Sequence, residues 1–527
     1  METPSTYEPK NIAGKLARYF LNSPLTLLLG LFLLVIGYLA LILMPREEDP
    51  QMVVSGSSVI VAMPGATAKE IEQIIVQPLE RKLKEVKGIE HIYGHAMDSV
   101  GIVTAAFYIG EEKEDSNLKI YDKIMQNMDI LPKTAQMPMV KPLDIDIDIP
   151  IISIAFYSHD QSISQTALTD KVKDIQHQIN GLPNVAVTSK KGGYNHQYSI
   201  QVDLHKLSGY NLSMGQIVQA VESLAYDVPD IKTRTQQQEI VIMGIKNAID
   251  SEEDIGNIIV AQYNGSAIYL KDIATIEDGH DYQNFQSARI CIKNNDNPIE
   301  QFPQVTLTVS KLKGTNAVII ADEVKDELQK YKAQLKKEGI SYIITRNYGE
   351  RANEAVSELV MHLVISIVII AILLIFALGW RESLIVTFTV PAILAITLFV
   401  AYLTDQTINR ITLFAFLLSL GLLVDAAIIV IENIHRHFHS SESAHESVDD
   451  TLIKATDEIG SPTNIATLAI IFTMVPMAFV GQMMGAFMKP IPANVPVALI
   501  ASLFVAYIFT PWMAKRLMKK PDLSEGH

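Results

Sequence analysis

Apolar residues along this chain of 527 residues gather in six long stretches, which polar segments separate. A helix that crosses the hydrocarbon core of a bilayer needs about 20 mainly apolar residues. Each stretch approaches or reaches that length, so the pattern predicts six membrane-spanning helices. The stretches lie at about 25–44, 355–378, 384–403, 411–431, 464–480 and 494–512.

The polar segment between the first two stretches holds roughly 310 residues, which is too many for a loop and enough for a folded module. An extended run opens this module, and residues 67–86 then have the spacing of an amphipathic helix. Thr67 and Glu70 stand at the spacing of a capping box for that helix. A break at Asp98 and Ser99 predicts a hairpin between two further strands.

The order strand, helix, strands, helix recurs after Pro150. Repeated strand-helix-strand units around an antiparallel sheet are typical of split βαβ, ferredoxin-like subdomains. A β-rich insert at about 190–275 interrupts the second repeat. The module is therefore expected to be of the α+β class.

The first apolar stretch follows Lys10, Lys15 and Arg18, as the core of a signal peptide would. Its apolar core from Leu25 to Met44 is longer than the usual 7–15 residues of such a peptide. No cleavage site with small residues follows it. We therefore expect a retained membrane anchor.

Lys and Arg in short loops mark the cytoplasmic side of a membrane protein. Counting the spans alternately places most of these residues on the side of both chain ends. That side holds Lys10, Lys15, Arg18, Arg381, Arg436, Lys454, Lys515, Arg516, Lys519 and Lys520, and the other holds Arg46, Arg351, Arg410 and Lys489. The predicted fold class is a membrane α-helical protein with six transmembrane helices and a large periplasmic α+β module of ferredoxin-like βαβ subdomains.

Composition narrows the possible functions. A net charge of −15 argues against a nucleic-acid partner, because phosphate binding needs a basic surface. Cys291 is the only cysteine, so no disulfide can form within the chain. The motifs of P-loop ATPases, zinc peptidases and serine hydrolases are absent from the sequence, so no enzyme activity and no cofactor are predicted. Energy must then come from an ion gradient, worth about 2.3 kcal/mol per charge at 100 mV.

Three sets of residues have the chemistry of metal ligands. They are Asp144, Asp146 and Asp148; His435, His437 and His439; and the methionines at 137, 139, 483, 484 and 488. On a strand the aspartates would face one way, but without a calcium-loop glycine or glutamate a solvated edge or linker strand is favoured. The histidines are expected to face different sides of a solvated helix exit. The methionines suit a soft metal, although methionine more often fills apolar gaps. No metal site is predicted.

Asp425 lies inside the fourth apolar stretch, where a carboxylate costs about 2.5–3.5 kcal/mol on insertion scales. Gly421 and Ala426 are small enough to let another helix approach closely. Glu432 and Asn433 lie nearer the inner boundary, within reach of interfacial water. Desolvation and a cationic partner shift the pKa of a carboxyl group in opposite directions. A carboxyl group balanced between them can gain and lose a proton near neutral pH, so Asp425 is the predicted proton relay. The alternative is a permanent hydrogen-bonded contact between helices.

Four segments resemble, in composition and in order, the N-terminal half of a resistance-nodulation-division (RND) efflux transporter, in its inner-membrane permease subunit. These segments are residues 386–400, 407–437, 458–487 and 507–517. The resemblance implies a trimeric, proton-driven antiporter in the bacterial inner membrane. It also implies a periplasmic adaptor protein and an outer-membrane channel as partners, besides membrane lipid.

The resemblance also implies a division of the chain. Residues 45–140 and 141–350 would form two porter subdomains, and the β-rich insert would be a docking part. The predicted parts are a cytoplasmic segment 1–24, a first transmembrane helix 25–44, a periplasmic porter region 45–350 with the docking insert at about 190–275, transmembrane helices two to six in 351–514, and a cytoplasmic tail 515–527.

Two departures from the family pattern leave alternatives open. Many drug exporters carry two adjacent aspartates where this chain has Asp425 and Ala426, and the single aspartate is similar to the heavy-metal branch. Family members also have twelve helices, and the lysine that pairs with the aspartate lies in the other half. A second polypeptide, a second copy or a longer gene product would supply it. Export of hydrophobic or amphipathic compounds is the leading hypothesis, metal export the next, and a non-transporting scaffold or translocation accessory protein the third.

Overall fold

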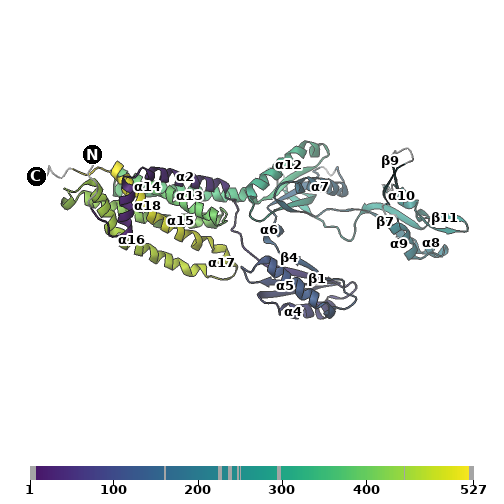
Figure 1. Ribbon diagram of the computed structural model, residues 1–527. Coiled ribbons are helices and arrows are strands. Elements are labelled where there is room, and N and C mark those ends of the chain that lie inside the picture. Colours follow the sequence, from purple (N-terminus) through teal and green to yellow (C-terminus); the bar gives the residue numbers. More distant parts are fainter. Residues whose placement is uncertain are drawn as a thin grey trace.

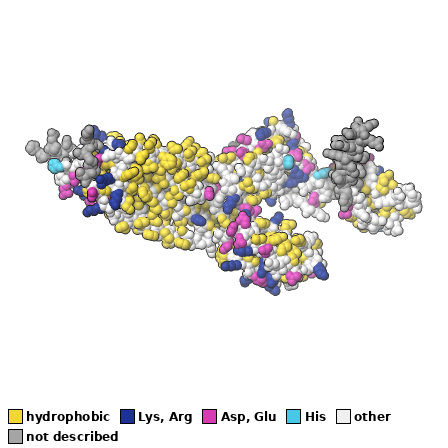
Figure 2. Space-filling view, in the orientation of Figure 1, with side chains coloured by type: hydrophobic (Ala, Val, Ile, Leu, Met, Phe, Trp, Pro, Cys, Tyr) yellow, Lys and Arg dark blue, Asp and Glu magenta, His cyan; other side chains and the backbone are white. Residues whose placement is uncertain are grey.

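The computed structural model describes residues 7–159, 162–223, 228–234, 240–245, 249, 251–293, 298–443 and 445–521. The molecule is elongated, with a helical bundle at one end and a module of sheets at the other (Figure 1). Both chain ends lie at the end of the bundle that is remote from the module. Hydrophobic side chains cover the visible face of the bundle, whereas charged side chains gather at its ends and on the module (Figure 2).

Six spans in the described chain are long and apolar enough to cross a membrane, which confirms the six predicted stretches. A short helix α1 (Ile12–Leu21) precedes them. The spans are α2 (Leu25–Leu43), α13 (Tyr348–Ala377), α14 (Trp380–Leu403), α15 (Arg410–Phe438), α16 (Val448–Ala478), and α17 (Gln482–Met488) continued by α18 (Pro490–Leu517). A membrane-type helical part and a separate sheet-containing module therefore make up the chain.

Within the bundle, α15 and α18 are the most buried spans, and their apolar side chains form the main core. Small residues permit close helix contacts. A Cβ atom added at Gly37 of α2 would overlap the side chain and backbone of Ala395 in α14. Because Gly37 has no side chain, α2 can pack closely against α14.

The first part of the module is an antiparallel sheet with the strand order β2-β3-β1-β4. Its strands are β1 (Gly56–Ala62), β2 (Ile89–Met97), β3 (Val100–Phe107) and β4 (Met139–Pro142). Its helices are α3 (Ala68–Ile71), η1 (Glu72–Val76), α4 (Gln77–Leu83), α5 (Lys113–Gln126) and the short turn η2 (Met128–Ile130). The predicted capping box is confirmed, because the Thr67 amide donates to Glu70 Oε2 at 2.8 Å. The predicted hairpin turn is also present, with Ser99 at a φ of 66°.

The second part is a five-stranded antiparallel sheet, in which β14 pairs with β13, β5 and β6, and β5 also pairs with β15. Its strands are β5 (Ile152–Tyr157), β6 (Val185–Lys191), β13 (Arg289–Ile292), β14 (Glu300–Lys311) and β15 (Ser341–Asn347). Helices α7 (Gln165–Asn180) and α12 (Ala317–Lys337) supply apolar side chains to its core. Because β14 pairs along much of its length on both sides, it is the central strand of this sheet.

A third part lies farthest from the bundle (Figure 1) and corresponds to the predicted β-rich insert, although it also contains helices. Strands β7 (His196–Val202) and β12 (Ala274–His280) form its antiparallel base. The remaining elements are α8 (Leu204–Gly209), α9 (Met214–Glu222), β8 (Val228–Arg234), β9 (Ile240–Ile245), α10 (Glu252–Gly256), β10 (Ile259–Tyr263), β11 (Ser266–Tyr269) and α11 (Leu270–Ile273). A small core of its own joins α8, α9, α10, β10, β11 and α11 to this base.

The prediction of a strand at Asp144, Asp146 and Asp148 is wrong. This segment forms a short helix, α6 (Ile145–Asp148). The Asp144 amide donates to Asp148 Oδ2 at 2.9 Å, and the Asp144 carboxylate forms an ion pair with Lys113. Aspartate side chains readily bond to nearby backbone amides and so favour turns over strands. The side chain of Asp146 lies outside the described residues.

Close contact between α2 and α14 gives a testable prediction. Gly37→Val should destabilise the bundle by about 1–3 kcal/mol, because a larger side chain forces apart two packed backbones. The melting temperature of the protein in detergent measures this loss. Leu39→Val is the control, since Leu39 is exposed on the same helix. Equal melting temperatures for both variants would show that the contact is dispensable.

Candidate functional site

Asp425 lies near the midpoint of α15, a helix of 29 residues. The helix begins after Asn409, whose Oδ1 accepts hydrogen bonds from the Ile411 and Thr412 amides at 3.0 Å each. Between Arg410 and Glu432 the sequence of this helix contains no other charged residue. The span thus presents a single carboxyl group at its apolar centre.

One face of α15 is not covered by the described part of the chain. Its residues follow one another at intervals of three or four, which places them along one side of a helix. They are Phe414, Leu418, Gly421, Asp425, Ile429 and Glu432, all of them exposed. We call these six residues the open face. A Cβ atom added at Gly421 would meet nothing within 4 Å.

Asp425 makes no hydrogen bond or ion pair with any residue that the structure describes. Its apolar neighbours on the open face are substantially exposed, at 43% for Phe414, 53% for Leu418 and 41% for Ile429. The opposite side of α15 is buried in the bundle core. A carboxyl group therefore lies among apolar side chains on a surface that the described residues leave uncovered.

The other residues singled out from the sequence divide between two sides of α15. Gly421 and Glu432 share the open face with Asp425. Ala426 is buried on the opposite side, and Asn433 is buried against α16. The Asn433 amide nitrogen donates to the Ala455 carbonyl oxygen at 2.7 Å, so this residue joins two helices.

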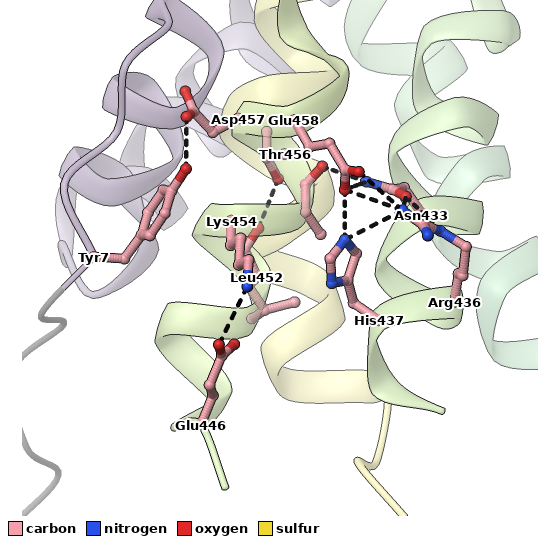
Figure 3. A network of polar contacts seen from close by, with 11 residues as sticks. Tyr7, Asn433, Arg436, His437, Glu446, Leu452, Lys454, Thr456, Asp457 and Glu458 are labelled. Carbon is pink, nitrogen blue, oxygen red and sulfur yellow. Dashed lines mark hydrogen bonds and ion pairs between the residues drawn. The ribbon is translucent and has the colours of Figure 1, made fainter. Parts of the chain in front are cut away.

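A polar network joins the ends of α15 and α16 close to the chain termini (Figure 3). Glu458 of α16 accepts from Arg436 Nη2 at 3.0 and 3.1 Å, and from the Asn433 amide at 3.2 Å. It also contacts His437 Nε2 at 2.5 Å. The sequence did not single out Glu458, because its partners lie some 20 residues away and no local spacing indicates them.

His435 and His437 face different partners, as predicted, but the prediction is wrong for His439, whose ring lies against that of His435 with centroids 4.3 Å apart. His435 Nδ1 contacts Glu382 of α14 at 3.3 Å, whereas His437 contacts Glu458. The expectation of a fully solvated exit is wrong for His437, which is mostly buried in the network. Helix α15 continues to Phe438, and this extension carries His437 onto α16.

Asp457, the residue before Glu458, fixes the start of the chain. Its carboxylate accepts from the Tyr7 hydroxyl at 2.9 Å, the Lys10 amide at 3.1 Å and the Asn11 amide at 2.7 Å. Burial, and then the hydrogen bond to Asp457, raise the pKa of Tyr7 to about 12. The hydroxyl therefore stays protonated and remains a donor at neutral pH. A Cβ atom at Gly14 would overlap Asp457, so α1 and α16 are in close contact.

Within the described residues, no group of three or more His, Cys, Asp or Glu side chains could hold a metal ion. Four of the five methionines that the sequence offered as soft ligands do not fill apolar gaps either. Met137, Met139, Met483 and Met484 are exposed.

The fold and the open face define a class of protein. It is a polytopic membrane protein with a large α+β module inserted between its first and second spans, and a carboxyl group at the centre of its fourth. The sequence profile of the AcrB/AcrD/AcrF family matches residues 16–527. The chain therefore belongs to this family of RND efflux transporter permeases, which confirms the resemblance found in the sequence.

The contact between the chain start and α16 gives a second prediction. Tyr7→Phe removes one donor from the buried Asp457 carboxylate, and hydrogen bonds to charged groups contribute about 1.5–3 kcal/mol. Trypsin should then cleave detergent-solubilised protein faster at Lys10 and Lys15. Tyr19→Phe serves as control, because Tyr19 is exposed. If both variants are cleaved at the wild-type rate, the Tyr7 hydroxyl does not hold this segment.

Proposed function

We propose that this chain is one half of a proton-driven RND antiporter that exports hydrophobic or amphipathic compounds, with Asp425 as its proton relay. The observation that carries the proposal is the position of Asp425 on the open face of α15. A carboxyl group at that depth in a membrane is stable only when it is protonated or paired. Alternation between these two states is the chemistry that a proton-coupled transporter requires.

The open face of α15 supports a second half as partner. Phe414, Leu418 and Ile429 offer an apolar surface on both sides of Asp425, and Gly421 leaves room for a close helix. A lysine on that partner helix would pair with the carboxylate when Asp425 is ionised. The partner is another polypeptide, a second copy or the remainder of a longer product.

The arrangement proposed for the pump follows the family. The termini are cytoplasmic, and residues 45–350 form a periplasmic porter region whose β-α-β parts are ferredoxin-like. The distal third part, predicted as the insert at 190–275, is the docking part. The assembly is a trimer in the inner membrane that works with a periplasmic adaptor protein and an outer-membrane channel, as permeases of this family typically do.

Export of a heavy-metal cation is the alternative within the same class. The single aspartate of α15 and the exposed Met137 and Met139 favour it, because thioether sulfur is a ligand for soft metals. A non-transporting scaffold is the alternative of another class, and it predicts no effect of Asp425 on any flux.

Asp425→Asn tests the proposal, since asparagine keeps the shape of the side chain but cannot gain or lose the proton. In cells that express the complete pump but no other exporter, ethidium efflux should fall to the background rate. Asp405→Asn is the matched control, because Asp405 lies in the α14–α15 loop at a φ of 55°, which asparagine also adopts. Efflux that persists in the Asp425 variant, at normal protein levels, would exclude a proton relay at this position.

Growth assays separate the two kinds of cargo. If the cargo is amphipathic, the pump should raise survival on ethidium and detergents and leave survival on copper and silver salts unchanged. The opposite result would assign the pump to metal export. In either case Asp425→Asn should remove the protection, whereas a scaffold would give none.

A further inference from the structure

The segment that leaves the first membrane helix is bound to the loop that begins α15. We call residues 45–51 the exit segment. The Glu47 amide donates to the Ile408 carbonyl oxygen at 3.0 Å, and the Ile408 amide donates to the Pro45 carbonyl oxygen at 2.9 Å. The Arg410 amide donates to the Glu48 carbonyl oxygen at 3.2 Å. Any displacement of the outer end of α15 must therefore act on the exit segment.

The Glu47 side chain connects the exit segment to the module. Its carboxylate forms an ion pair with Lys311 Nζ at 2.6 Å, and the two side chains are only 4% and 5% exposed. Lys311 is the last residue of β14, the central strand of the second sheet. The pair thus connects the segment after the first membrane helix to the end of the central strand.

Thr407 completes the connection to α15. Its hydroxyl donates to Glu47 Oε2 at 3.1 Å and accepts from the Asn409 amide nitrogen at 3.2 Å. Asn409 is the N-cap of α15. A continuous run of buried polar contacts therefore leads from Lys311 through Glu47 and Thr407 to the helix that carries Asp425.

Other ion pairs that join the exit segment to the membrane helices are more exposed. Arg410 and Asp49 are 2.5 Å apart but partly exposed, and Arg351 lies 3.9 Å from Glu48 with a largely exposed side chain. Exposed pairs contribute little and rearrange easily. Separating a buried pair is costly, because it leaves an uncompensated charge. The Glu47–Lys311 pair is therefore the connection that moves as a unit.

Two cavities flank this connection. One of about 170 Å³ is lined by Glu47, Lys311 and Tyr348 among others. The second, of about 500 Å³, is lined by Gln51, Thr407 and Asn409 among others. One cavity therefore adjoins the Glu47–Lys311 pair, and the other adjoins Thr407 and Asn409.

We propose that Glu47, Lys311 and Thr407 are positioning residues that transmit a displacement of α15 to β14. This inference rests on the proposed function, in which a change at Asp425 moves α15. Asp425 lies 16 residues after Asn409, or roughly 24 Å along the helix at 1.5 Å per residue. A helix is stiff over this length, and its first turn is bound to Glu47. The Glu47–Lys311 pair therefore passes the state of Asp425 to the second sheet.

Hydrogen–deuterium exchange of the assembled pump in nanodiscs tests the inference without knowledge of the cargo. Asp425→Asn represents the permanently neutral state. It should change the exchange of the amides in residues 300–311, which include β14. The same exchange in Asp425→Asn and wild type would overturn the proposal.

A double variant tests the connection through Glu47 and Lys311. Glu47→Leu with Lys311→Met replaces the buried pair by apolar side chains, an exchange that often preserves stability. In this double variant, adding Asp425→Asn should no longer change the exchange of residues 300–311, while its effect within α15 remains. Thr407→Val, which keeps the ion pair, should reduce the response of residues 300–311 to the same substitution. A response that persists in both backgrounds would overturn the proposal.

Glu327→Leu with Lys330→Met is the matched control, because it removes an ion pair on the surface of α12. In this control, adding Asp425→Asn should change the exchange of residues 300–311 as it does in the wild type. If it does not, loss of the change is not specific to the Glu47–Lys311 pair and the inference is overturned. Failure of the proposed function is seen separately. Ethidium efflux that survives Asp425→Asn contradicts the proton relay. If Asp425→Asn still changes the exchange of residues 300–311 in the double variant, only the connection through Glu47 and Lys311 is contradicted.

Discussion

A carboxyl group on the apolar side of a membrane helix cannot remain both ionised and unpaired in hydrocarbon. This constraint organises what the structure of this chain can do. Asp425 is placed at the centre of α15, on the face that the other five spans leave open within the described chain. Everything else in the bundle packs on the opposite side of that helix, where Leu423 and Ala427 belong to the core. The helix therefore has one uncovered side that carries Asp425 and one side that is buried in the core.

The two ends of α15 are held in different ways. At the end near the chain termini, Asn433, Arg436 and His437 join it to Glu458 of α16. At the end near the module, Asn409 and Thr407 join it to Glu47 and so to Lys311. Charged side chains occur at the boundaries of α15, where burial is partial or pairing is available, and Asp425 is the only charged residue between Arg410 and Glu432. In the proposed function, a change of charge at the centre of the helix would act on both of these connections.

The sequence predicted best those features that depend on near neighbours. The six spans follow from local apolar content, the Thr67 cap from a spacing of three residues, and the Ser99 hairpin from a short break between two strands. The prediction failed at α6. The alternating aspartates suggested a strand, but the Asp148 carboxylate accepts a hydrogen bond from the Asp144 amide and the segment forms a helical turn. The prediction also failed for His437. A solvated position was expected, but α15 extends to Phe438 and places His437 against Glu458 of α16.

The sequence by itself determined the class of the protein and singled out Asp425, because one charged residue is conspicuous within an otherwise apolar stretch. The tertiary structure alone decided which side of α15 is open. It also decided that Glu458 meets His437, that Asp457 holds the chain start, and that Glu47 pairs with Lys311 across 264 residues. These pairings arise from the packing of segments far apart in the chain. No local pattern of residues encodes them, since each partner is an ordinary polar residue until the fold buries it.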